Sequence, residues 1–161
     1  MKTRLQILSL IIGCAGLASA QELDSKAVLS SFLASLKAGK HQEASQLVFS
    51  PSGAEAATQA RVKMLSAKSM ETGQSLGEIV TGKQEGTVAR LIVKDIAKRG
   101  DGKPDYDGIL MVKRGDTWKI VLNAREVEES PGAATPQERK ALAELRKWQD
   151  EVMSDLNNRP H

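Results

Sequence analysis

Apolar residues in the first third of the chain recur at three- and four-residue spacing, which predicts helices. Asp24 can cap the first of these helices, and Gly39 stands where a left-handed C-terminal cap would end it. Similar patterns predict a short second helix over 42–48 and a third over 54–67, separated by a Ser-Pro-Ser-Gly break. The apolar positions of the first helix are Val28, Leu29, Phe32, Leu33 and Leu36.

From residue 76 the pattern becomes that of strands. Four are expected, over 76–83, 87–96, 106–113 and 117–126, and glycine-containing turns between them predict an antiparallel meander. The second and third strands carry runs that are apolar on both faces, so we expect them at the centre of the sheet with cover on each side. The residues expected to be largely buried are Phe32, Leu36, Leu91, Val93, Leu110, Val112, Trp118, Ile120 and Leu122.

A long amphipathic helix is expected at the C-terminal end. Thr135 can cap it, Pro136 suits its first turn, and Glu138 can complete a capping box. The helix either packs on its own domain or serves dimerisation or partner binding, because its apolar stripe is short for an autonomous coiled coil. That stripe consists of Leu142, Leu145, Trp148, Val152 and Leu156.

The first twenty residues have the layout of a bacterial-type export signal. Lys2 and Arg4 precede an apolar run, and Ala-Ser-Ala at 18–20 predicts a mature chain that begins at Gln21. Cys14 is the one candidate modification site, because Ile-Ile-Gly-Cys also resembles a lipobox whose cysteine is lipidated. We therefore expect a periplasmic or secreted protein, with a membrane-anchored lipoprotein as the alternative.

Removal of residues 1–20 changes the charge and the cysteine count. The 23 basic residues fall to 21 against 20 acidic ones, so the net charge falls from +3 to +1 and gives no basis for a nucleic-acid partner. Cleavage after residue 20 would leave no cysteine for a disulfide or a thiol nucleophile. The expected organisation is a signal peptide over 1–20, an α+β roll domain over 21–129, and a linker with the C-terminal helix over 130–161.

Several short motifs resemble functional sites but lack the residues around them that the chemistry needs. Residues 77–83 have the glycine and lysine spacing of a phosphate-binding loop, but Gln84 replaces the Ser or Thr that would bind Mg²⁺, and strands flank the motif. Arg-Gly-Asp occurs within 98–101 and again within 113–116, where it reads as a turn beside a solvated basic pair.

Candidate metal-binding and catalytic residues are few. The acidic segment 101–108 lacks the alternating oxygen ligands of a calcium loop. His41 and His161 are the only histidines and are far apart, and Tyr106, expected in a hairpin loop beside Asp105 and Asp107, is the only tyrosine. We therefore expect no catalytic residue, no cofactor-binding residue, no metal ligand and no cofactor.

The order of elements resembles the nuclear-transport-factor-two-like superfamily, a cystatin-like α+β roll, and within it the small exported bacterial members of unassigned activity. The features that carry the resemblance are the helix over 28–36, the following Lys-Ala-Gly-Lys-His-Gln-Glu-Ala segment, the strand over 108–113 and the Trp-Lys-Ile after the last turn. It covers about 24–126 and implies a pocket between the curved sheet and the helices, which family members use for isomerisation, hydrolysis, ligand binding or dimerisation.

These observations predict an α+β fold in which N-terminal helices pack on a curved four-stranded antiparallel sheet, plus a long C-terminal amphipathic helix. The expected function is that of an exported, non-catalytic domain that binds a small molecule or a protein. The partner is expected to be a protein or a small apolar ligand, with a homodimer as one alternative and a membrane only if Cys14 is lipidated. The alternative function is an isomerase- or hydrolase-like enzyme with a carboxylate in its pocket.

Overall fold

The computed structural model describes residues 15–72, 76–98, 104–128 and 133–159. It confirms the α+β class, with helices first, then a four-stranded sheet, then a long helix. Among the described residues, no helix is long and apolar enough to cross a membrane. Cys14 and the charged start of the export signal lie outside the described residues, as do His161 and the first Arg-Gly-Asp triplet. The elements are α1 (Ala15–Lys37), α2 (His41–Gln46), α3 (Glu55–Thr72), β1 (Leu76–Glu85), β2 (Val88–Lys98), β3 (Pro104–Arg114), β4 (Thr117–Val121), α4 (Arg125–Glu128) and α5 (Pro136–Asn157).

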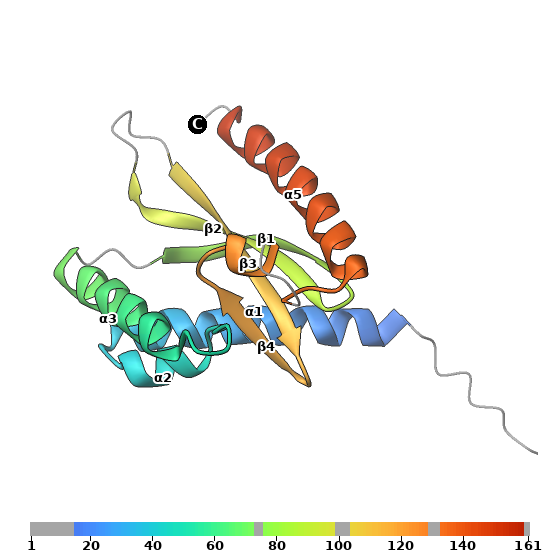
Figure 1. Ribbon diagram of the computed structural model, residues 1–161. Helices are drawn as coiled ribbons and strands as arrows, with labels where there is room; N and C mark the ends of the chain where they lie inside the picture. Colours follow the sequence, from blue (N-terminus) through green and yellow to red (C-terminus); the bar gives the residue numbers. More distant parts are fainter. Residues whose placement is uncertain (1–14, 73–75, 99–103, 129–132, 160–161) are drawn as a thin grey trace, which may run out of the picture.

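The strands form one antiparallel sheet in the order β1-β2-β3-β4. The two strands with runs that are apolar on both faces, β2 and β3, are therefore central, as predicted. Helices α1–α3 lie on one face of this sheet, and α5 crosses the other (Figure 1). The outer edge of β4 is closed by the segment after α2, because Phe49 N donates to Ile120 O and Ile120 N donates to Leu47 O. The sheet is therefore the middle layer of a three-layer domain.

Alternate residues of the central strands enter two separate cores. On the α1–α3 face, Ala89, Leu91 and Val93 of β2 join Trp118 and apolar residues of the helices. The other face of the sheet packs on α5, and the buried members of this second core are Val88, Leu110, Val112, Val121, Val127, Ala134, Leu142 and Leu145. The apolar stripe of α5 thus packs on its own sheet, with Trp148 and Val152 only partly buried.

The predictions for the start of the first helix and for the end of the last strand were wrong. Asp24 does not cap the first helix, because the alanine-rich segment before it continues α1 back to Ala15. The last strand ends at Val121 rather than at residue 126, and Leu122 is consequently only partly buried. The chain turns at Asn123, whose side-chain oxygen accepts a hydrogen bond from Arg125 N at 3.2 Å. Arg125 is the first residue of α4. The left-handed cap at Gly39 is confirmed, with φ of 72°.

The start of α5 is held by the predicted capping box. Thr135 Oγ1 accepts from Glu138 N at 3.1 Å, and Glu138 Oε2 accepts from Thr135 N at 2.8 Å. The other Glu138 oxygen accepts from Thr87 Oγ1 at 2.8 Å and from Arg114 Nη1 at 2.7 Å, which ties the helix to the β1–β2 and β3–β4 turns. Burial by itself would raise the pKa of Glu138. The hydrogen bonds outweigh this effect and lower the pKa below the ordinary value of 4.5.

This lowered pKa makes part of the stability depend on pH. Because the folded-state pKa of Glu138 lies below its unfolded value, its stabilisation is present above about pH 4.5 and is lost as the pH falls through the folded-state pKa. Glu138→Gln, which keeps a capping-box side chain, should cost about 1 kcal/mol of unfolding free energy at neutral pH. Urea denaturation at several pH values should show this difference shrinking on acidification, and a constant difference would contradict the assignment.

Candidate functional site

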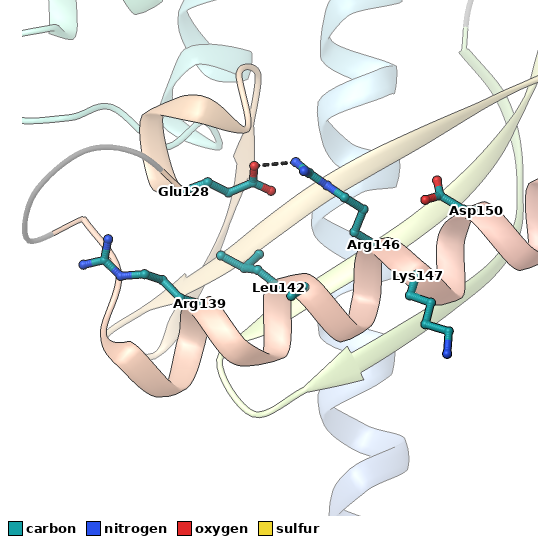
Figure 2. Close-up of a pocket in the computed structure, with 7 residues that line it drawn as sticks. Glu128, Arg139, Leu142, Arg146, Lys147 and Asp150 are labelled. Atoms are coloured by element: carbon teal, nitrogen blue, oxygen red, sulfur yellow. Dashed lines mark hydrogen bonds and ion pairs between the residues drawn. The ribbon is translucent and has the colours of Figure 1, made fainter.

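A hollow of about 420 Å³ lies between the short helix α4 and the outward side of α5 (Figure 2). Its apolar part comes from Leu142 and Ala143, and charged side chains surround them. We call this hollow the α4–α5 groove, and its lining residues are Glu128, Arg139, Leu142, Ala143, Arg146, Lys147 and Asp150.

The periodicity of α5 explains why these residues meet. Counted from Arg139, the lining positions of the helix follow at three, four, seven, eight and eleven residues, which places them on one face. The capping box sets where the helix begins and therefore which residues reach this face. The α4 side of the groove depends on Asn123, which starts the turn that presents Glu128, and on Val127, which is fully buried.

Beneath the groove lies a buried cation that the sequence analysis did not single out. Arg90 occupies the α5 face of β2 between Val88 and Ile92, and only 6% of the residue is exposed. Its Nη1 donates to Gln149 Oε1 at 2.7 Å, and its Nη2 lies 3.3 Å from Glu128 Oε1. The signal in the sequence was an arginine inside an otherwise apolar run of a central strand.

Gly108 allows Gln149 to reach this arginine. It pairs with Ile92, so it lies two residue pairs from Arg90 along the sheet. A Cβ at Gly108 would lie 2.1 Å from Gln149 Oε1, which means that any other residue would displace the amide. The glycine in the middle of β3 is therefore explained by the close approach of α5.

The single carboxylate of Glu128 is shared by two arginines. Its carboxylate pairs with Arg90 below and with Arg146 above, and Figure 2 shows the second contact. Burial lowers the pKa of Arg90 and the Glu128 carboxylate opposes this shift, so the guanidinium is a charge held in a poorly solvated place. The Arg90 Nε atom is buried and has no hydrogen-bond partner.

Across the whole groove, cationic groups outnumber carboxylates. Arg146 and Lys147 expose 56% and 81% of their side chains, and Arg139 is also exposed. The Lys147 Nζ atom is 3.9 Å from Glu151, a pair too exposed to hold the lysine in place. With Arg90 beneath, four cationic side chains face the two carboxylates of Glu128 and Asp150.

Two further hollows have a different character. The one between α2 and α3 measures about 610 Å³ and is lined mainly by uncharged polar side chains such as Gln42, Ser45 and Gln59. The third, of about 370 Å³, lies beside the β1–β2 turn and the start of α5. Neither combines an apolar floor with fixed charges as the α4–α5 groove does.

The pocket that the family resemblance implied, between the helices and the sheet, is not among these hollows. Phe32, Leu91 and Trp118 instead fill that space together with other apolar residues. The buried polar or charged residues of the described chain include no carboxylate and are Ser25, Thr58, Ser66 and Arg90.

The motifs that resembled functional sites have structural roles. The phosphate-loop-like segment is part of β1, and its Lys83 lies 3.4 Å from Glu85. Gly115, in the second Arg-Gly-Asp triplet, makes a turn at φ of 59°, as predicted. Its basic pair is not simply solvated, because Arg114 binds Glu138 and also donates to Ala133 O at 2.6 Å. The Ala133 carbonyl lies within reach of Arg114 because α5 starts beside this turn.

The remaining candidates lie apart. His41 begins α2, and Tyr106 belongs to β3, where it pairs with Lys94, rather than to a hairpin loop. The strand extends to Pro104 because its residues continue the ladder with β2. Among the described residues, no group of three or more His, Cys, Asp or Glu could hold a metal ion.

No protein-family model matches the sequence, and no curated protein does. Solved structures of similar fold include the following two. A proposed NTF2-like transpeptidase from Campylobacter jejuni is 11% identical, with a TM-score of 0.44 over 61% of this chain and 97% of that one. A proposed calcium/calmodulin-dependent protein kinase II association domain from Xanthomonas campestris is 14% identical, with a TM-score of 0.38 over 74% of this chain and 92% of that one. The name of the first includes the superfamily that the sequence resembles.

Proposed function

We propose that this chain is an exported, non-catalytic binding domain that contacts a protein partner through the α4–α5 groove. The observation that carries the proposal is the groove itself, where an apolar floor lies among charges held by a rigid helix. The segment before Gln21 supports export, because it has the order of charged, apolar and small residues that a signal peptidase recognises.

The filled space between the sheet and α1–α3 supports binding at the surface rather than inside the roll. An isomerase- or hydrolase-like enzyme would need a carboxylate whose burial raises its pKa. Ala143 instead lies exposed at the outer surface, next to the buried Leu142, where a partner could cover it and leave the charged side chains at the rim. This arrangement favours a protein partner over an enclosed small molecule.

Site-specific photo-crosslinking tests this proposal. A photoreactive residue at position 143, inside the groove, should capture a partner from a cell-envelope extract, whereas the same residue at position 140 of α5, outside the groove, should not. The captured protein, once purified, should bind the unmodified chain and lose more than about tenfold in affinity against Ala143→Trp, because a bulky side chain fills the floor.

The matched control is Lys140→Trp, which puts the same bulk on the same helix outside the groove and should leave affinity unchanged. Equal capture at both positions, or equal binding by both tryptophan variants, would show that the α4–α5 groove is not the binding surface.

A further inference from the structure

We infer that the α4–α5 groove recognises an acidic peptide segment in polyproline II conformation, in which two carboxylate side chains lie three positions apart with apolar residues between them. This inference rests on the proposed function and adds the chemistry of the partner. Its basis is the order of side chains along α5, where a cation, an apolar stretch and further cations follow one another.

The first step is the spacing of the cations. Arg139 and Arg146 are seven residues apart on one face of α5, which corresponds to about 10 Å along the helix axis. In polyproline II conformation three residues make one turn and rise about 9 Å, so two side chains three positions apart lie on the same side of the peptide. A peptide lying along the helix would therefore bring the first carboxylate to Arg139 and the second toward Arg146, with Lys147 adding positive charge at the adjacent position of the helix.

The second step is the surface between those cations. Leu142 and Ala143 lie midway, where the residues between the two carboxylates would sit. Ala143 is exposed and small, so it leaves room for an apolar side chain to contact the edge of Leu142. A uniformly charged ligand would leave this part of the groove without a matching contact.

The third step is that Glu128 does not cancel the positive charge. Its carboxylate is already shared by Arg90 and Arg146, and the planar guanidinium of Arg146 has five N–H donors. Arg146 can thus keep Glu128 and still donate to a ligand. Because Arg90 lies beneath, the electrostatic potential stays positive at the Arg139 and Lys147 ends of the groove. Beyond Lys147, the carboxylate of Asp150 would repel a further acidic side chain of the peptide.

The probe is a fluorescent peptide with an acetyl-Glu-Ala-Leu-Glu-amide core, compared by anisotropy with the same peptide carrying Gln in place of both Glu residues. The full chain should bind the Glu peptide more tightly than the Gln peptide, and the difference should fall as salt is raised. Arg139→Gln and Lys147→Gln should each weaken binding of the Glu peptide about three- to fivefold. All three substitutions, including the control Lys140→Gln, are at exposed positions of α5, so thermal denaturation should show an unchanged fold.

Lys140→Gln removes an equal charge from the same helix outside the groove and should change affinity less than about twofold. The inference is overturned if the Gln peptide binds equally well, if Lys140→Gln weakens binding as much as Lys147→Gln, or if the Glu peptide does not bind. Should the crosslinking at position 143 succeed while the Glu peptide fails, the groove remains a binding surface and only its acidic specificity is wrong. Failure of the crosslinking alone contradicts the proposed function.

Discussion

Trp118→Ala is expected to lower the free energy of unfolding by about 3–5 kcal/mol, because it truncates the largest fully buried side chain of the described residues. Trp118 is 1% exposed and belongs to the core between β4 and the N-terminal helices. Its removal would leave a cavity that the surrounding sheet and helices cannot close. Urea denaturation followed by circular dichroism should show a clearly lower midpoint.

Trp118→Phe separates loss of volume from loss of the indole N–H. The Trp118 Nε1 atom is buried and has no hydrogen-bond partner. Replacing the indole by a phenyl ring therefore removes a buried polar group without breaking a hydrogen bond. We expect this change to cost less than about 1.5 kcal/mol. Equal losses for the alanine and phenylalanine variants would contradict the packing described for β4.

Glu128→Ala is expected to cost about 3 kcal/mol, because it leaves the buried Arg90 charge without the carboxylate that pairs with it. The Arg90 side chain is 7% exposed and that of Glu128 is 19% exposed, so water can replace only part of the lost interaction. The same urea titration at neutral pH measures the loss.

Two controls test whether burial is the cause. Glu43→Ala removes a carboxylate from the exposed Lys40–Glu43 pair, whose side chains are 58% and 60% exposed, and should cost less than about 1 kcal/mol. Arg90→Met replaces the buried cation by an apolar side chain of similar length and should be close to neutral. If Glu128→Ala costs no more than Glu43→Ala, the network beneath the groove contributes nothing to stability.

The fold was predictable to the extent that its causes are local. The strand pattern of 87–96 and the capping box at Thr135 and Glu138 depend on residues within a few positions of one another, and both are confirmed. The end of the last strand was predicted too late because Asn123 acts through one side-chain hydrogen bond that periodicity does not register.

The groove could not be predicted in the same way. Arg90 meets Glu128 and Gln149, which follow it by 38 and 59 residues, and only the packing of α5 on the sheet brings these side chains together. The sequence alone contained the arginine in an apolar strand and the glycine at 108, but not the reason for either.

The sequence by itself determined the order of elements, the central place of the two doubly apolar strands and the face of α5 that is apolar, because each follows from backbone periodicity. The tertiary structure decided that α5 packs on its own sheet, that apolar side chains fill the space between sheet and helices, and that the hollow lies outside, against α4. These outcomes depend on the volumes of side chains distant in sequence, which no local pattern records.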